Sequence, residues 1–345
     1  MDLIIKPTEK CNFKCTFCSS TQITDDKSAE LDLQYVFDFL KRFPETQTII
    51  VNGGDPLMMP VEYYWKIIDW LDKNNYEHTT ISITSNLWPF YKNPGKWKDL
   101  FNNRRVGVTT SFQYGGGRLK GDLSEFTEQD FWKVSDAMLE HCGYRPDFIA
   151  VITEENEHLA VKNVQLAMRM DVECKLNYAM SSGPPTVFKG IVMGQEGKPY
   201  LLADIYEIYV DIWKRRLHHW EFNTKQMMKR LNGRATCCPQ NRDCDSGIRT
   251  LQPSGDYYSC GAFGDDRQYP IDFKQEMAGP KIFPIKHVAE LQTMTDDCYS
   301  CPMFDICNGC KKTIKDHKDY GLTQKHCVKM KTLAKDIIDA NSINT

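Results

Sequence analysis

Residues 2–18 read DLIIKPTEKCNFKCTFC, a short apolar run followed at once by three closely spaced cysteines. The run DLIIKP (2–7) predicts a β-strand, because branched apolar side chains favour extended backbone. The spacing C-x3-C-x2-C then places three thiols in the loop after that strand. Structural zinc needs four ligands, and so does a [4Fe–4S] cluster, which takes one ligand per iron. Three cysteines therefore indicate a cluster whose fourth iron stays open for a substrate or a cofactor.

The alternation of strand-like and helix-like segments continues from this loop over residues 1–180. The predicted strands are residues 2–7, 47–52, 79–86, 106–112, 147–153 and 173–179. The predicted helices are residues 31–43, 61–74, 96–101, 127–142 and 156–170. Such β/α units imply parallel strands joined by right-handed crossovers. A complete eight-unit barrel usually needs about 250 residues, so the pattern predicts an α/β fold with a partial (β/α)6 barrel of the TIM type.

The remaining chain is organised differently, because SSGPP (181–185) interrupts the alternation. One strong helix is predicted at about 201–219, and a last one at about 325–341. Short loops and clustered cysteines indicate a small domain that depends on bound metal for its stability. The predicted division is a partial barrel over residues 1–180, a bridging region over 181–236, a cysteine-rich domain over 237–330, and a C-terminal helix and tail over 331–345.

Composition limits the class of protein. A hydrophobic fraction of 41%, a charged fraction of 26% and a net charge of -3 are ordinary for a globular protein and give no general sign of nucleic-acid binding. The first residues, MDLIIKP, lack the basic start of a signal peptide, and no run approaches the roughly 18 apolar residues that cross a membrane. We expect a cytoplasmic protein without a membrane partner. In a reducing compartment, 14 cysteines indicate metal or redox chemistry rather than disulfides.

The three-cysteine loop, with Phe17 just before the third cysteine, resembles that of the radical S-adenosylmethionine (radical SAM) superfamily. The resemblance implies that Cys11, Cys15 and Cys18 hold a [4Fe–4S] cluster and that S-adenosylmethionine binds the open iron. In that family, an electron from the cluster breaks a C–S bond of the cofactor, and the resulting 5'-deoxyadenosyl radical abstracts hydrogen from a C–H bond. The cofactor supplies this chemistry, while the protein orients it and excludes competing reactions.

The ends of the next strands carry further motifs of this family. NGGDP (52–56) follows the second strand, where the family places GGEP, with Asp55 in place of glutamate. TSN (84–86) ends the third strand, and SFQYGG (111–116) ends the fourth. By resemblance, the expected cofactor-binding residues are Phe17, Gly53, Gly54, Asp55, Ser85, Asn86, Ser111 and Gln113. For the last four, the alternative is that they only make hydrogen bonds at the strand ends.

The later cysteines form a second field. Cysteines 298, 301, 307 and 310 could form a zinc ribbon, but paired zinc knuckles usually lie about a dozen or more residues apart. With G255-x4-C260 and Cys327, the wider pattern resembles the SPASM domain of radical SAM enzymes, although its last spacing is x2 instead of x3. This implies two auxiliary [4Fe–4S] clusters and three clusters in all. The expected ligands are Cys238, Cys244, Cys260 and Cys310 for the first auxiliary cluster, and Cys298, Cys301, Cys307 and Cys327 for the second.

Three other cysteines need separate interpretation. Cys237 is an alternative to Cys238 as a cluster ligand, because the two are adjacent. Cys142 and Cys174 lie on segments that face the predicted core, so we expect them to be buried apolar residues.

The substrate is open between two classes. Enzymes with SPASM domains mostly modify peptides or proteins, which implies such a substrate and an electron donor such as flavodoxin or ferredoxin. The stretch WKRRLHHWEFNTKQMMKR (213–230) instead suits a nucleic acid, because basic and aromatic residues alternate in it. In this second interpretation the chain resembles bacteriophage radical SAM enzymes, which implies an enzyme acting in the host cytoplasm that rearranges an amino-acid group attached to thymine in DNA. The DNA contacts would come from Lys214, Arg215, Arg216, Lys229 and Arg230.

Two simpler interpretations compete with these. The basic stretch could be a solvated helix face whose Trp213, Leu217 and Trp220 pack inward. The whole protein could be a non-enzymatic iron–sulfur electron carrier, but a carrier has no need of an open iron. Sulfatase maturation is disfavoured, because Gly261 stands where those enzymes have an aspartate after the cysteine of G-x4-C.

Strand-end position also suggests which side chains face a substrate, because active sites of such barrels lie at the C-terminal ends of the strands. The expected residues at the barrel mouth are Gln113, Tyr114, Tyr178, Asp265 and Asp266. No acid, base or hydrogen-donor role can be assigned among them from the sequence.

Overall fold

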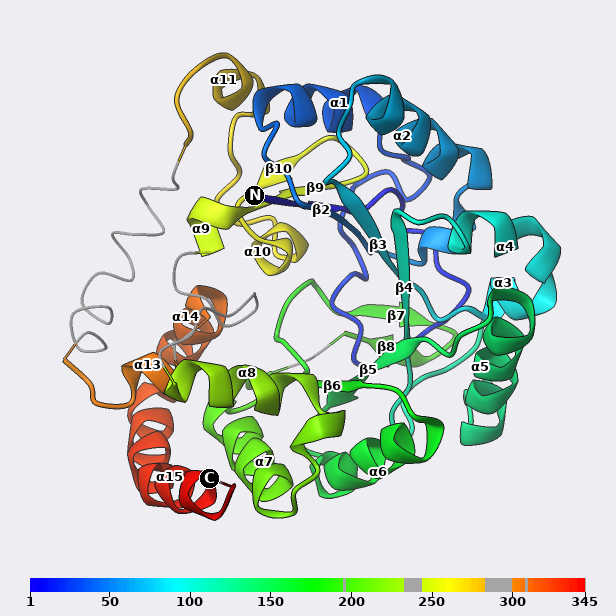
Figure 1. Cartoon of the computed structure of the whole chain (residues 1–345). Helices are drawn as coiled ribbons and strands as arrows, with labels where there is room; N and C mark the ends of the chain where they lie inside the picture. Colours follow the sequence, from blue (N-terminus) through cyan, green and yellow to red (C-terminus); the bar gives the residue numbers. More distant parts are fainter. Residues whose placement is uncertain (195–196, 233–243, 283–299, 308–309, 345) are drawn as a thin grey trace.

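The computed structural model describes residues 1–194, 197–232, 244–282, 300–307 and 310–344 (Figure 1). Within them, one eight-stranded sheet has the order β10-β9-β1-β2-β3-β4-β5-β6, and β7 pairs separately with β8. The strands from β1 to β6 are consecutive and parallel. Their bounds are β1 (Asp2–Ile5), β2 (Thr48–Val51), β3 (Thr80–Thr84), β4 (Val106–Ser111), β5 (Asp147–Ile152) and β6 (Cys174–Tyr178). The predicted α/β fold with a parallel, partial barrel is confirmed.

Helices cover the outer face of this curved sheet, as Figure 1 shows. They are α1 (Leu33–Arg42), α2 (Val61–Lys73), α3 (Trp88–Lys92), α4 (Pro94–Phe101), α5 (Glu128–Cys142) and α6 (Ala160–Met170), with the short turns η1 (Pro56–Met58) and η2 (Glu157–Leu159). In α1, Asp32 accepts a hydrogen bond from the backbone N–H of Gln34, and Phe39 is fully buried. Two helices fill the interval between β3 and β4, where the sequence predicted one. A proline in the first turn of each explains the division.

Strand side chains alternate between the helix layer and the inside of the barrel. In β1, Leu3 and Ile5 belong to the fully buried core, whereas Ile4 is only partly buried. The inner face is therefore the less tightly filled one. Because parallel strands end at the same edge of a sheet, the loops after β1, β2, β3 and β4 meet there. These are the loops that carry the predicted motifs.

Two further strands extend the sheet beyond β1. β9 (Ile248–Leu251) pairs in parallel with β1, and β10 (Tyr257–Tyr258) pairs antiparallel with β9. They are accompanied by α9 (Cys244–Gly247), α10 (Gly261–Asp265) and α11 (Phe273–Ala278). These residues fall in the predicted cysteine-rich domain, yet they complete the sheet of the barrel. The edge of β1 explains the difference, because its backbone N–H and C=O groups need partners when they are buried.

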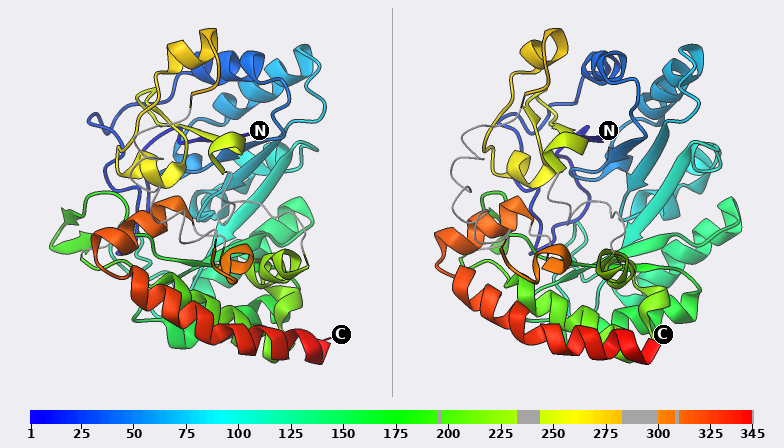
Figure 2. Two further views of the ribbon diagram at one scale, coloured as in Figure 1. Left: turned by 90° about the vertical axis from the view of Figure 1, so that its left-hand side faces the viewer. Right: turned by 60° about the vertical axis from the view of Figure 1, so that its left-hand side comes forward.

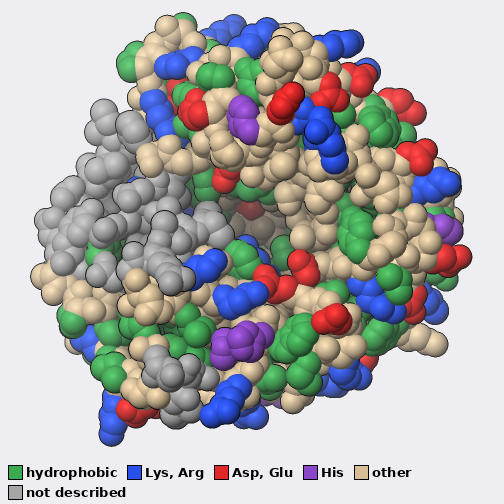
Figure 3. All heavy atoms as spheres, viewed as in Figure 1, with side chains coloured by type: hydrophobic (Ala, Val, Ile, Leu, Met, Phe, Trp, Pro, Cys, Tyr) green, Lys and Arg blue, Asp and Glu red, His purple; other side chains and the backbone are tan. Residues whose placement is uncertain are grey.

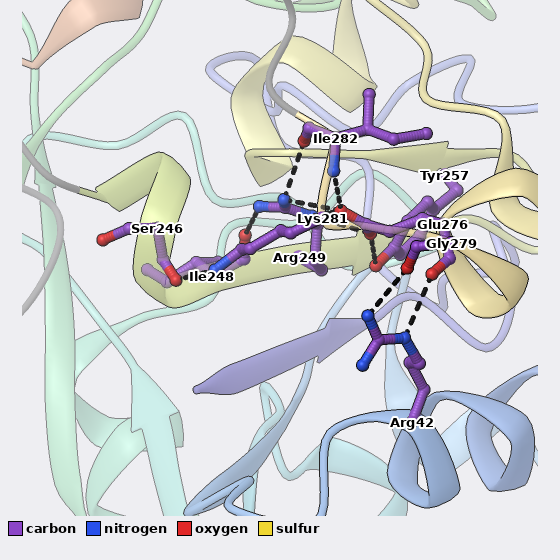
Figure 4. A network of polar contacts seen from close by, with 9 residues as sticks. All are labelled: Arg42, Ser246, Ile248, Arg249, Tyr257, Glu276, Gly279, Lys281 and Ile282. Carbon is purple, nitrogen blue, oxygen red and sulfur yellow. Dashed lines mark hydrogen bonds and ion pairs between the residues drawn. The ribbon is translucent and has the colours of Figure 1, made fainter.

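A buried polar network joins this extension to the helix layer (Figure 4). The side chains of Arg249 and Glu276 are fully buried and form an ion pair of 2.8 Å. Tyr257 donates a hydrogen bond of 2.5 Å to the same carboxylate. From α1, Arg42 donates to the carbonyl oxygens of Glu276 and Gly279. At the other end, Lys281 contacts the carbonyl oxygen of Ser246. The network thus ties β9, β10 and α11 to one another and to α1.

The bridging region and the C-terminal part add two short strands and several helices. Their elements are β7 (Thr186–Phe188), β8 (Ile191–Met193), α7 (Leu202–Lys214), η3 (His218–Trp220), α8 (Phe222–Leu231), α13 (Phe304–Cys307), α14 (Lys311–Asp319) and α15 (Thr323–Asn344). The helix predicted at 201–219 ends at Lys214, because Arg216 adopts a positive φ of 59°. The last helix is longer at both ends than predicted, and α15 packs lengthwise against α7 (Figure 2).

No helix within the described ranges combines the length and apolarity needed to cross a membrane.

Candidate functional site

The three N-terminal cysteines lie on a loop held between backbone partners. The N–H groups of Lys14 and Thr16 donate to the carbonyl oxygens of Leu119 (2.7 Å) and Gly117 (2.9 Å). The N–H of Gly194 in turn donates to the carbonyl oxygen of Thr16 (2.9 Å). The loop is therefore fixed from both sides by segments that follow β4 and β8. This places Cys11, Cys15 and Cys18 at the edge of the sheet where the strand ends meet.

The environment of these thiols opposes a free thiolate. Burial raises the pKa of all three, and it raises that of Cys18 to about 12. At Cys11, the negative charge of Asp55 adds to the effect. A metal ligand must nevertheless be deprotonated, so the site needs a bound cation to compensate the charge. Three partly buried thiols on one loop therefore suit a bound metal centre.

The spacing of the side chains indicates which kind of centre fits. Within the described residues, no three His, Cys, Asp or Glu side chains converge on a point that a single metal ion could occupy. A tetrahedral zinc ion with Zn–S bonds of about 2.3 Å would bring its sulfur ligands to about 3.8 Å of one another. In a [4Fe–4S] cluster each cysteine binds a different iron, so the ligands lie farther apart. Three cysteines on one short loop suit three irons of such a cluster.

The GGDP loop packs directly on the cysteine loop. The N–H of Gly54 donates to the carbonyl oxygen of Thr8 (3.0 Å), and that of Asp55 donates to Lys10 (2.8 Å). A Cβ atom at Gly54 would lie 2.3 Å from the Lys10 oxygen, and Gly53 has a φ of 117°. Only glycine satisfies both conditions. The two glycines thus allow the β2 loop to lie flat against the segment that leads into the cysteines.

Asp55 and its hydrogen-bond partners link the GGDP loop, the TSN loop and the cysteine loop. Its buried carboxylate accepts hydrogen bonds from Ser85 Oγ (2.9 Å) and from the N–H groups of Asn86 (3.0 Å) and Leu57 (2.9 Å). Burial raises its pKa to about 6 in spite of these bonds. The Asn86 amide then donates to Asn12 Oδ1 (2.8 Å) in the cysteine loop. Asp55, Ser85 and Asn86 therefore make strand-end hydrogen bonds, and they bring the Asn86 side chain beside the cysteines.

Arg118 is the site residue that the sequence did not reveal. It is 6% exposed, and its guanidinium donates to Ser111 Oγ (2.8 Å) and to Gln113 Oε1 (2.8 and 3.1 Å). The same group lies over the ring of Phe17, 5.2 Å from its centre. Its positive charge favours the ionised form of Cys15. Three of the predicted cofactor contacts thus converge on one buried cation beside the thiols.

A local signal for Arg118 exists in the sequence. It follows three glycines, 115 to 117, which all have positive φ values. A Cβ atom at Gly117 would lie 2.7 Å from Thr16 Oγ1, so the chain can approach the cysteine loop only without a side chain there. A glycine run after a strand indicates that the backbone lies close to another segment. A single basic residue directly after the run then places its charge near that segment.

The predicted residues of the barrel mouth separate into two groups. Asp265 lies at the cysteine loop, where it pairs with Lys6 and accepts a hydrogen bond of 3.4 Å from Ser20. Asp266 accepts from the N–H of Gly183 (2.8 Å). Both aspartates line a cleft of about 580 Å³. The space-filling view shows a hollow near the centre of the molecule with acidic and basic side chains beside it (Figure 3).

Tyr178 and Tyr114 lie elsewhere. The hydroxyl of Tyr178 is buried 2.6 Å from Thr313 Oγ1, at the contact of β6 with α14. Tyr114 accepts a hydrogen bond of 3.2 Å from Arg169 of α6, and Lys162 of the same helix covers its ring. Side chains alternate along the strand and its continuation, so Tyr114 faces the helix layer while Gln113 faces inward. The expectation that Tyr114 lines the barrel mouth is wrong.

Comparison with protein families identifies the N-terminal part. A model of the radical SAM superfamily matches residues 5–166, which include the three cysteines, GGDP and Arg118. The chain carries a radical SAM domain. The protein is therefore an enzyme, and the resemblance seen in the sequence is confirmed for this part. Comparison with curated proteins gave no match.

Solved structures extend the likeness over the C-terminal half. Histidine-tagged anSMEcpe with bound AdoMet has a TM-score of 0.71 at 16% identity, covering 99% of this chain and 95% of that one. Native anSMEcpe with AdoMet and the Cp18Cys peptide has a TM-score of 0.69 at 16% identity, covering 99% of both chains. SuiB of Streptococcus suis bound to the precursor peptide SuiA has a TM-score of 0.60 at 17% identity, covering 92% of this chain and 73% of that one. At such identities the likeness shows a shared fold.

Beyond the radical SAM domain, the predicted auxiliary ligands are only partly described. Cys237, Cys238, Cys298 and the side chain of Cys244 lie outside the described residues. The predicted ligands with described side chains are Cys260, Cys301, Cys307, Cys310 and Cys327. Cys310 is the N-cap residue of α14, and Cys307 ends α13, which packs against α8. Cys174 is fully buried in β6, as expected, and Cys142 is partly buried at the end of α5.

The basic stretch 213–230 is largely used inside the fold. Trp213 is fully buried, as the simpler interpretation predicted. Arg230 is 6% exposed, and it donates to the carbonyl oxygen of Ile306 (2.9 Å) and to Tyr206 (3.1 Å). Its guanidinium is therefore not available to a phosphate, and the expectation that it contacts DNA is wrong. Lys214 and Arg215 form surface ion pairs with Asp336 and Asp211, while Arg216 and Lys229 are exposed.

Proposed function

We propose that this protein is a radical SAM enzyme with a SPASM-like auxiliary-cluster region and that it modifies a residue of a peptide or protein. The observation that carries the proposal is the loop of three partly buried thiols, held by backbone hydrogen bonds beside Arg118. Cys11, Cys15 and Cys18 would hold the cluster to which S-adenosylmethionine binds. When bound, these groups supply reductive cleavage of the cofactor and abstraction of hydrogen from a C–H bond.

The chain's own residues fix the geometry of this chemistry. Arg118 places a buried positive charge beside the thiolates, where low local dielectric strengthens its effect. Ser111 and Gln113 hold the guanidinium in one orientation, and Phe17 packs against its face. By the family resemblance, the backbone of the GGDP loop would hold the cofactor's amino group. Asp55 keeps the GGDP and TSN loops together, so that these positions do not shift separately.

The C-terminal cysteines extend the proposal to two auxiliary clusters. Four protein ligands on each would leave no open iron, so these clusters would conduct or accept electrons rather than bind substrate. Such a pathway also needs an external donor of the flavodoxin or ferredoxin type.

A peptide substrate is favoured by the surroundings of the cleft. Arg267 and Asp319 are exposed and line it, so it offers both charges to a polar chain. Two of the structures similar in fold are complexes with peptides, Cp18Cys and SuiA. In the basic stretch, by contrast, Arg230 is buried and donates to a backbone carbonyl oxygen. A DNA substrate is therefore the second candidate, and it becomes an outcome of the binding test.

The cluster assignment is tested by iron content and cofactor cleavage after anaerobic reconstitution. The wild-type protein should bind about 12 irons, four for each cluster. Replacing Cys11, Cys15 and Cys18 together by alanine should remove about four irons and abolish formation of 5'-deoxyadenosine. Cys142→Ala is the matched control, because Cys142 lies on α5 away from the loop, and it should keep both properties. Cofactor cleavage by the triple variant would contradict the assignment.

The substrate class is tested by anaerobic binding to duplex DNA, single-stranded DNA and candidate peptides of either charge, across a salt series. A peptide maturase should bind its peptide and show no DNA binding beyond that of an unrelated polyanion. Tight DNA binding with a steep salt slope, lost when Lys214, Arg215 and Arg216 become glutamate, would move DNA to first place.

A further inference from the structure

A histidine that no motif predicted lies against one of the auxiliary cysteines. His326 Nε2 is 3.3 Å from Cys307 Sγ. His326 belongs to the first turn of α15 and is 5% exposed, whereas Cys307 is the last residue of α13. The contact therefore joins two separate helices at a thiol that the SPASM resemblance assigns to the second auxiliary cluster.

Cys307 is fixed by polar contacts with its backbone. The hydroxyl of Tyr206 lies 3.0 Å from the carbonyl oxygen of Cys307 and 3.1 Å from that of Ile306. Arg230 Nε donates to the same Ile306 oxygen (2.9 Å). Carbonyl groups at a helix end have no partner within the helix, so these donors from α7 and α8 hold the end of α13 in place. The direction of the Cys307 side chain is thereby set by the fold.

The histidine ring is held as firmly. Its centre lies 5.2 Å from that of His317 in α14, and His317 Nε2 is itself 3.3 Å from the carbonyl oxygen of Tyr200. Among the described residues, Nδ1 of His326 has no hydrogen-bond partner. A neutral ring carries one proton, and only at Nε2 does that proton meet an acceptor, the sulfur of Cys307. The geometry therefore favours a ring that donates toward the cysteine.

Two ligands of a single tetrahedral metal could also lie about 3.5 Å apart. In that arrangement, replacement of His326 would remove bound metal, which the test below measures. In a [4Fe–4S] cluster, two ligands bind different irons and lie farther apart than this contact. His326 and Cys307 are thus too close to be two ligands of one cluster, and a hydrogen bond between the ring and the sulfur fits their distance of 3.3 Å.

We propose that His326 Nε2–H donates a hydrogen bond to the Cys307 thiolate of the second auxiliary cluster and so raises the reduction potential of that cluster. This inference rests on the proposed function, because it needs Cys307 to be a cluster ligand. Reduction adds negative charge to a cluster, so a donor aimed at its thiolate stabilises the reduced state more than the oxidised one. His326 is thereby a positioning residue, and its hydrogen bond makes this cluster a better electron acceptor than the cluster would be without it.

The test is a redox titration of the auxiliary clusters, in which electron paramagnetic resonance measures the reduced fraction. It uses the full chain with Cys11, Cys15 and Cys18 replaced by alanine, so that only auxiliary clusters contribute. His326→Leu should lower the equilibrium constant for reduction about tenfold, which is 59 mV for a one-electron couple. His326→Gln can place an amide N–H near the position of Nε2 and should retain the potential. His326→Asn is too short to reach the sulfur and should behave like the leucine variant.

His317→Gln is the matched control, because it alters the partner ring without removing the contact with Cys307. It should leave the potential unchanged. An unchanged potential in His326→Leu and His326→Asn, with full iron content, would overturn the inference. Loss of about four irons in these variants would also overturn it, since His326 would then be a ligand. A wild-type protein that binds only about four irons in total would overturn the auxiliary clusters themselves and the inference with them.

Discussion

Arg118 is a single residue whose positive charge lies near the three cysteines of the radical SAM site. Three partly buried thiols lie near it, and desolvation raises the pKa of each. Burial lowers the pKa of Arg118 in turn, while the nearby cysteines act in the opposite direction. Guanidinium groups remain charged even so, because their ordinary pKa is above 12. The fork of N–H donors also fixes Ser111 and Gln113, so charge and geometry come from the same side chain.

We predict that Arg118→Met lowers the rate of S-adenosylmethionine cleavage at least about tenfold, because it removes both the charge and the anchor of Ser111 and Gln113. Arg118→Lys keeps the charge without the fork and should give an intermediate rate. The measurement is formation of 5'-deoxyadenosine by the reduced protein, normalised to iron content. Full activity in Arg118→Met at normal iron content would remove Arg118 from the site's machinery.

At the scale of an element, β9 depends on the buried pair of Arg249 and Glu276. Burial by itself raises the pKa of Glu276, but the hydrogen bonds from Arg249 and Tyr257 outweigh it and lower the pKa below its ordinary value of 4.5. The pair therefore contributes stability that is fully present above pH 4.5 and is lost as the pH falls through the lowered pKa. Arg42 connects the same loop to α1, so this contribution reaches the barrel.

We predict that Glu276→Gln destabilises the protein by about 3–5 kcal/mol at neutral pH, because Arg249 would stay buried without its counter-charge. The difference from the wild type should shrink as the pH falls below the ordinary value of 4.5. Urea unfolding at several pH values measures both effects. Asp69→Asn, an exposed change on α2, should not alter the unfolding midpoint. A constant difference down to pH 3 would argue against the ionised pair.

At the scale of the whole molecule, Lys312 joins the C-terminal layer to the barrel mouth. Its side chain is 2% exposed, and its ammonium contacts Asp316 of α14 (2.5 Å), Asp266 (2.9 Å) and the carbonyl oxygen of Ser181 (2.8 Å). The three partners come from α14, from the segment after α10 and from the loop after β6. One buried cation therefore holds three segments that are far apart in the sequence around the cleft.

We predict that Lys312→Met destabilises the protein by about 3 kcal/mol, because it leaves two acidic side chains facing each other at the cleft. Lys315→Met is the matched control one turn away, since its partner Asp319 is half exposed and such a pair is worth less than about 1 kcal/mol. Both free energies of unfolding come from urea titration. Equal effects of the two changes would show that Lys312 is no more than a surface lysine.

Local signals were enough for the barrel and for the first cluster. Strand and helix periodicity depends on neighbouring residues, so β1 to β6 could be predicted with their order. The spacing of Cys11, Cys15 and Cys18 is likewise local, and it indicated an open-iron cluster before any fold was known. The pairing of β9 with β1 could not be predicted in this way, because it joins residues about 245 positions apart. The backbone hydrogen bonds that join them do not depend on which side chains the two strands carry.

By itself, the sequence determined the class of fold, the radical SAM motifs and the field of cysteines that follows. Only the tertiary structure decided which residues surround them: Arg118 beside the thiols, Tyr114 on the helix side, Arg230 in the interior and His326 against Cys307. The reason is physical. A motif fixes the chemistry of a few side chains, but burial and charge at a site come from segments that meet only when the chain folds.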